Sequence, residues 1–152
     1  MATSVKTRTS YESDLYAWTQ EQAALLRSRR AEELDWDNLA KEIQVVGGSE
    51  RRELKNRLRI ILLHLLKWQG QPARRGASWR KSLRSQRRHI RNLLEDSPSL
   101  RRQVPAMMAD AYGDAVKDAV DETGLPSDRF PVDCPYAPDD VLAEDYLPDE
   151  SF

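Results

Sequence analysis

The sequence predicts an all-α fold, a helical bundle of about five helices with an extended acidic C-terminal segment that carries one short helix. Between Tyr11 and Thr123, apolar residues recur every three or four positions, and no long run alternates with period two. Hydrophobic residues make up 39% of the 152 residues and charged residues 32%, a polar globular composition. We expect residues 1–10 to be flexible, residues 11–152 to form a single domain, and the Pro/Asp-rich residues 125–152 to pack on it as a strap.

The first two helices are predicted from caps and apolar stripes. Ser13 is expected to cap a first helix, with Asp14 in its opening turn. A second, short helix begins near Trp36, and Gly47-Gly48 is expected to end it because glycine accepts the left-handed turn beyond a helix. The alternative is one long helix that bends at the two glycines.

The third helix has the clearest pattern. Its apolar residues are spaced four, three, four and three apart: Leu54, Leu58, Ile61, Leu65 and Trp68. Further apolar residues fill the other faces between Ile60 and Trp68. A helix that is apolar on every side belongs at the centre of a bundle or at an oligomer interface.

A basic fourth helix, residues 78–95, follows a loop that contains Gly70, Pro72 and Gly76. Ser78 is expected to cap it. All four tryptophans of the chain lie on apolar stripes, which predicts core or interface anchors. Trp68 and Trp79 flank the loop, so we expect a helical hairpin tied by tryptophans.

A fifth helix is predicted to begin at Ser97-Pro98 and to stop at Gly124. Pro105 is expected to bend or restart it. The strap that follows has room for one short helix, near Pro138 to Asp145, and its interspersed aromatic residues predict that it lies against the bundle.

Charge is strongly segregated, although the net charge is only −1. Residues 50–102 hold sixteen Lys or Arg and four Asp or Glu, whereas residues 103–152 hold two and thirteen. Either the acidic part folds over the basic part, or each part meets a different partner.

The order of short motifs resembles that of a known bacterial family. HLLKWQ, followed by QP and SWR, is its most specific part, and DLYAWTQEQAALLR, QRRHI, SPSL, ETGL and CPY extend it from about Tyr11 to Asp149. The chain is similar to domain of unknown function 29, best populated in cyanobacteria and proteobacteria. The resemblance implies an all-α bundle, no established activity and no catalytic residues to carry over. Pro105 departs from the uninterrupted helix usual in that family.

His64 is expected to be a core histidine bonded to a backbone carbonyl, a carboxylate or a neighbour beside a tryptophan, because it lies among leucines. The alternative is an Arg-x4-His pair of Arg59 and His64, the pattern of metal-independent HEPN ribonucleases. Arg84 and His89 share the spacing, and residues five apart point to faces roughly 140° apart.

The basic helix is the candidate nucleic-acid-binding element. Its side chains and those of the preceding loop are suited to phosphates: Arg74, Arg75, Arg80, Lys81, Arg84, Arg87, Arg88 and Arg91. A solvated helix neutralised by the acidic segment from Asp110 to Glu150 is the simpler explanation, and the pI of about 6.2 favours it.

The sequence predicts no metal site, no cofactor and no membrane span. Cys134 stands alone among acidic residues and is a poor nucleophile candidate. A single cysteine and the absence of a secretory pattern predict a cytoplasmic protein. The function expected first is a non-enzymatic interaction module, antitoxin-like or adaptor, that binds a protein partner or itself. Nucleic-acid binding and the ribonuclease are the alternatives.

Overall fold

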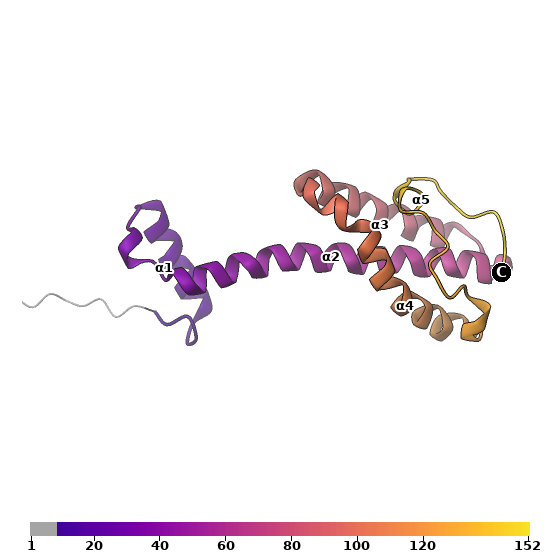
Figure 1. Cartoon of the computed structure of the whole chain (residues 1–152), viewed down its shortest axis with the longest axis horizontal. Helices are drawn as coiled ribbons and strands as arrows, with labels where there is room; N and C mark the ends of the chain where they lie inside the picture. Colours follow the sequence, from indigo (N-terminus) through magenta and orange to yellow (C-terminus); the bar gives the residue numbers. More distant parts are fainter. Residues whose placement is uncertain (1–8) are drawn as a thin grey trace, which may run out of the picture. The chain divides into compact units, whose positions relative to one another are not determined.

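The computed structural model describes residues 9–152, and these form helices without any strand (Figure 1). The all-α prediction is therefore confirmed. Most of the N-terminal segment that we expect to be flexible, residues 1–8, lies outside the described residues. The elements in chain order are α1 (Leu15–Arg27), η1 (Ala31–Glu33), α2 (Trp36–Gly70), η2 (Pro72–Arg74), α3 (Ala77–Asp96), η3 (Pro98–Gln103), α4 (Val104–Thr123), η4 (Ser127–Arg129) and α5 (Pro138–Leu142), where η marks a 3-10 helix.

The chain divides into two compact units, residues 1–48 and 49–152. Helix α2 contributes its first part to the former and its second part to the latter. The single domain expected over residues 11–152 stays a prediction.

The first unit is organised around Trp18, which is 2% exposed. The indole Nε1 donates to a carboxylate oxygen of Asp35 at 3.1 Å, and the amide of Asp35 donates to the buried Gln22 at 2.8 Å. The cap of α1 is Asp14 and not Ser13, because the Asp14 carboxylate accepts from the amide of Ala17. The start of the first helix was thus predicted within one residue.

Helix α2 runs through Gly47 and Gly48 without a break, so the prediction that these glycines end a helix was wrong. Glycine stops a helix when it adopts the left-handed conformation, and within residues 9–152 only Gly124 has a positive φ among the glycines. At both positions inside α2, an added Cβ would meet nothing within 4 Å. The second and third predicted helices are one helix.

The core of the second unit surrounds the C-terminal half of α2, which Figure 1 shows running between α3 and α4. All five seam residues predicted for this half are buried, from Leu54 to Trp68, and so are Leu62, Leu63 and Leu66. The interpretation as a central helix is confirmed. Trp36, at the other end of α2, is 62% exposed and does not belong to the core.

Two further helix starts differ from expectation. Helix α3 begins at Ala77 after an extended Gly76, so Ser78 lies inside the first turn and does not cap it. The segment after Ser97 first forms η3, and α4 starts only at Val104. Pro105 therefore occupies the first turn of α4, where a missing amide hydrogen breaks no helical hydrogen bond. Pro105 restarts the helix, one of the two expected outcomes.

The acidic strap packs on the second unit, and the short helix predicted within it is α5. Phe130, Tyr136 and Val141 are buried in the core. The Tyr136 hydroxyl donates to the side-chain oxygen of buried Gln69, whose Nε2 donates to the Glu150 carbonyl at 3.0 Å. These contacts hold the strap across the C-terminal end of α2.

The hairpin between α2 and α3 is tied by tryptophans in a reciprocal way. Lys67 of α2 lies over the ring of Trp79 on α3, 4.9 Å from the centroid. Arg80 of α3 lies over the ring of Trp68 on α2 at 5.1 Å. Cation–π contacts of this kind contribute about 0.5–1 kcal/mol each at partly exposed sites.

Candidate nucleic-acid interface

Helix α3 is divided lengthwise into an apolar face and a basic face. Leu83, Ile90 and Leu94 are buried in the core. On the other side, Arg80, Lys81, Arg84, Arg88 and Arg91 are exposed. Because residues three and four apart are neighbours on a helix, these cations form one row about 16 Å long at 1.5 Å per residue.

Arg87 joins this row to the strap and is itself only 4% exposed. Its Nε donates to the Val141 carbonyl at 2.9 Å, and its Nη1 donates to the Glu144 carbonyl at 3.2 Å. The Nη2 atom is buried and has no hydrogen-bond partner. Burial lowers the pKa of Arg87, while the nearby carboxylate of Asp145 acts in the opposite direction. One nitrogen of this buried guanidinium therefore donates no hydrogen bond, and an unsatisfied buried charged group lowers stability.

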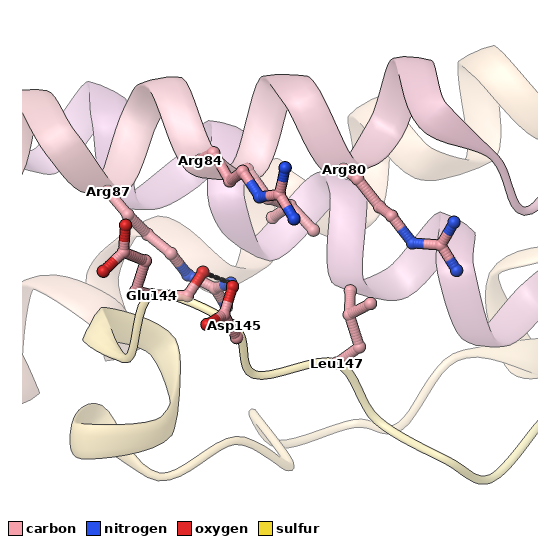
Figure 2. Close-up of a pocket in the computed structure, with 7 residues that line it drawn as sticks. Arg80, Arg84, Arg87, Glu144, Asp145 and Leu147 are labelled. Carbon is pink, nitrogen blue, oxygen red and sulfur yellow. Dashed lines mark hydrogen bonds between the residues drawn. The ribbon is translucent and has the colours of Figure 1, made fainter.

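Three adjoining hollows follow the basic face where the strap turns beside α3. The first, about 170 Å³, is lined by Arg80, Arg84 and Arg87 of α3 and by Glu144, Asp145 and Leu147 of the strap (Figure 2). The second, about 220 Å³, is lined by Arg87, Ile90, Arg91, Leu94, Arg101, Leu142 and Glu144. The third, about 450 Å³, is lined by Ala77, Arg80, Lys81, Arg84, Ser85, Arg88, Arg91 and Glu144. Glu144 lines all three, so they form one region, which we call the α3 groove.

The strap neutralises little of the basic face. Among residues 9–152, the one ion pair between the strap and α3 joins Arg91 and Glu144 at 3.9 Å, with side chains that are 51% and 66% exposed. Two acidic side chains of α4 pair instead with α2, Asp118 with Arg59 and Glu122 with Lys67. The expectation that the acidic segment neutralises the basic helix is therefore met at only one position.

The residues predicted to bind nucleic acid fall into two groups. Arg80, Lys81, Arg84, Arg88 and Arg91 are exposed in the groove, and Arg87 forms its buried wall. Arg75 is occupied elsewhere, because its Nε donates to the Trp68 carbonyl at 2.6 Å and its Nη2 to Ser151 at 3.2 Å. Arg74 is exposed on η2 and lines none of the three hollows.

The site residues predicted from the sequence include none of the groove residues outside α3, which are Arg101 of η3 and Leu142, Glu144, Asp145 and Leu147 of the strap. Arg101 closes the basic run from Arg74 to Arg102, which is a signal in the sequence. Nothing in the local sequence indicates which part of the strap lies beside α3, because that contact joins residues more than fifty positions apart.

Arg59 and His64 do not share a site. The guanidinium of Arg59 holds Asp118 through two hydrogen bonds of 2.6 and 2.8 Å, which raise the pKa of Arg59. His64 is half-buried, and its Nδ1 lies 2.8 Å from the Ile60 carbonyl. Burial lowers the pKa of His64, and the hydrogen bond offsets part of that effect. The structural interpretation of His64, a histidine bonded to a backbone carbonyl, fits this geometry.

Other candidate chemistry is weak in the described residues. Cys134 is half-buried, and burial raises the pKa of its thiol, which disfavours the thiolate. Across residues 9–152, no group of three or more His, Cys, Asp or Glu side chains is arranged to hold a metal ion. The helices of this part of the chain are too short or too polar for a membrane span.

The comparisons with known proteins agree with the motif order. A family model described as a domain of unknown function, DUF29, matches residues 10–147. No curated protein and no solved structure matches the chain. Since the family model covers nearly the whole sequence, this helical chain with its basic groove belongs to the DUF29 family.

Proposed function

We propose that this protein is a cytoplasmic nucleic-acid-binding module that holds the phosphate backbone of a single strand in the α3 groove. The observation that carries the proposal is the row of exposed cations on α3. Of these, Lys81, Arg84 and Arg88 have no ion-pair or hydrogen-bond partner within residues 9–152. When such unpaired cations bind a polyanion, counterions are released and no internal ion pair has to be broken first.

The shape of the groove supports a single strand. The strap turn at Glu144 and Asp145 borders the row of cations on one side (Figure 2). A flexible strand follows such a bordered row more readily than a stiff duplex does. No aromatic side chain lines the three hollows, so bases have no stacking platform there. We therefore expect binding through phosphates with little preference for sequence.

The test is a fluorescence-anisotropy titration with labelled single-stranded oligonucleotides between 50 and 200 mM salt. Five phosphate contacts give a slope of log K against log salt of about −3.5. Arg84→Glu and Arg88→Glu should each weaken binding at every sequence and, by removing one phosphate contact, make the slope shallower by about 0.7.

Lys117→Glu is the matched control, because Lys117 is 80% exposed on α4, away from the groove, and undergoes the same charge reversal. It should leave the affinity within about twofold of the wild type. Absence of binding at 50 mM salt, or equal losses from Arg88→Glu and Lys117→Glu, contradicts the proposal.

A second candidate function is protein interaction through residues 15–46, either with another protein or with a second copy, as in an antitoxin-like or adaptor module. Its support is that the large apolar side chains exposed in the described residues, Val132 excepted, lie here: Leu15, Tyr16, Leu26, Trp36, Ile43, Val45 and Val46. Such exposed apolar side chains are typical of interaction surfaces when they lie close together.

Sedimentation analysis separates this candidate from the first. If the protein self-associates through these residues, Ile43→Lys and Val46→Lys should shift it towards the monomer. Val132→Lys is the matched control, because Val132 is 94% exposed in the strap. If the wild type stays monomeric at high concentration, self-association is contradicted. If Ile43→Lys leaves the affinity for nucleic acid unchanged, the two functions use different surfaces.

A further inference from the structure

We propose that the hollow between Arg87, Arg91 and Arg101 seats a phosphomonoester dianion, specifically the terminal phosphate of the strand held in the α3 groove. This inference rests on the proposed function and adds the recognition of a strand end. Three features of the hollow carry it, namely an unused buried guanidinium, an excess of positive charge and an apolar lining.

The first feature is the state of Arg87. Two of its nitrogens are fixed by backbone carbonyls of the strap, and Nη2 is buried without a partner. The side chain is therefore already held in place before any ligand arrives. A guanidinium fixed in this way is suited to an anion that accepts two or more hydrogen bonds, as a phosphate or a carboxylate does.

The second feature is charge. Arg87, Arg91 and Arg101 line the hollow, and Glu144 is its one carboxylate. Glu144 lies 3.9 Å from Arg91, beyond hydrogen-bond distance, and its side chain is 66% exposed. Arg101 has no partner within residues 9–152. Three cations against one loosely held carboxylate match a dianion better than the single charge of a phosphodiester.

The third feature is the lining. Ile90, Leu94 and Leu142 contribute apolar surface, so few polar groups other than the guanidinium groups and Glu144 are available to a ligand. A phosphodiester inside a strand has chain on both sides and must pass through its site. A terminal phosphate has chain on one side only, and the hollow shares Arg91 and Glu144 with the largest part of the groove, from which the strand would enter.

Glu144 has a defined role in this proposal, because its carboxylate is the negative charge that the phosphate must displace. Glu144 and Asp145 are both exposed at the strap turn, and neither side chain forms a hydrogen bond (Figure 2). Since Nη2 of Arg87 is buried, an anion reaches it only if these exposed side chains turn away, and the proposal requires that movement. Removal of the Glu144 charge should therefore strengthen binding, whereas loss of a packing residue would weaken it.

The experiment compares three probes by isothermal titration calorimetry with the full chain: a deoxythymidine decamer with a 5′-phosphate, the same decamer with a 5′-hydroxyl, and thymidine 5′-monophosphate. We expect the phosphorylated decamer to bind about tenfold more tightly than the hydroxyl form. Arg101→Gln should remove that preference, and Glu144→Gln should increase it severalfold. Arg101 and Glu144 are exposed, so both variants should keep the fold.

Lys81→Gln is the control. Lys81 lines only the third hollow, so this substitution should weaken binding of both decamers equally. The preference should also fall below about pH 6, where a phosphomonoester takes up its second proton. If thymidine 5′-monophosphate binds as tightly as the phosphorylated decamer and needs Arg101, the seat is supported and its ligand is a small phosphomonoester.

The failures of the two proposals differ. Equal binding of the two decamers, together with no effect of Glu144→Gln, overturns the phosphate seat and leaves the groove intact. If thymidine 5′-monophosphate binds and neither decamer does, the proposed function is overturned, whereas the phosphate site remains supported.

Discussion

Arg59 of α2 and Asp118 of α4 form a two-point ion pair, from Nε to Oδ2 at 2.6 Å and from Nη2 to Oδ1 at 2.8 Å. The pair connects the central helix α2 to α4. It also binds Arg59, the arginine of the Arg-x4-His pattern, so that its guanidinium is already engaged. Lys67 of α2 and Glu122 of α4 form a second ion pair between the same two helices, at 2.7 Å. Acidic residues of α4 thus contribute to packing, while the cations of α3 stay exposed.

The ion pair should contribute modestly to stability. Its side chains are 41% and 27% exposed, and solvent screens such pairs, so we expect a coupling energy below about 1 kcal/mol. A double-mutant cycle of Arg59→Ala and Asp118→Ala in urea denaturation measures it. A coupling near zero would show that the two hydrogen bonds seen here make no net contribution.

The protein should leave RNA intact in buffer that contains a chelator. The reason is that Arg59 is bound to Asp118 and His64 to the Ile60 carbonyl, so neither side chain is positioned to act on a common phosphodiester. Gel analysis of a labelled RNA checks this. Cleavage that His64→Ala abolishes while the circular dichroism spectrum stays unchanged would restore the ribonuclease hypothesis.

Stability should fall with pH below about 6.5 because of His64. Burial lowers its pKa in the folded state, so the unfolded chain binds the proton first as the pH falls. The neutral form therefore contributes stability that is fully present above the unfolded pKa of about 6.5 and is lost as the pH falls through the lower folded value.

Urea denaturation at pH 7.5 and pH 5 for the wild type and His64→Gln measures this contribution. The variant should lose less stability between the two pH values than the wild type does. His89→Gln is the matched control on exposed α3 surface and should behave as the wild type. An unchanged pH dependence in His64→Gln contradicts the assignment.

Alanine should have opposite effects at the glycines of α2 and at Gly124. Gly47→Ala and Gly48→Ala should each stabilise the protein by about 0.5–1 kcal/mol, because both lie inside a helix with open space around the added methyl group. Gly124→Ala should destabilise it by about 1–2 kcal/mol, because Gly124 has a φ of +71°.

Urea denaturation followed by helical circular dichroism compares the three variants. Destabilisation by Gly47→Ala or Gly48→Ala would mean that α2 is interrupted there in solution, as the sequence pattern first indicated.

Substitutions at Gln69 and Tyr136 should have strongly non-additive effects on the free energy of unfolding. Gln69→Leu leaves the buried Tyr136 hydroxyl without its acceptor and removes the bond to the Glu150 carbonyl, at a cost of about 1–3 kcal/mol. Adding Tyr136→Phe to Gln69→Leu should recover part of the loss, because the orphaned hydroxyl is then gone. Strictly additive losses in urea denaturation would contradict the contact.

Local sequence patterns were sufficient for the helices and for the central position of residues 54–68. Helical spacing of apolar residues depends only on 3.6 residues per turn, and Gly124 ends α4 because it has no Cβ. The hairpin with Trp68 and Trp79 at its two helix ends also followed from a short loop, which brings neighbouring helix ends together. The helix caps and the continuity of α2 through Gly47-Gly48 did not follow, because the sequence does not show which residue caps a helix or whether a glycine keeps the helical conformation.

The α3 groove is a property of the tertiary structure. The sequence determined that α3 has a basic face and that the strap is acidic, and these two facts alone favoured neutralisation of one by the other. The folded chain attaches the strap through the backbone carbonyls of Val141 and Glu144 to Arg87. Within residues 9–152, Glu144 is the one strap carboxylate that forms an ion pair with α3. Which groups meet across more than fifty residues depends on how the whole core packs, and only the tertiary structure decides it.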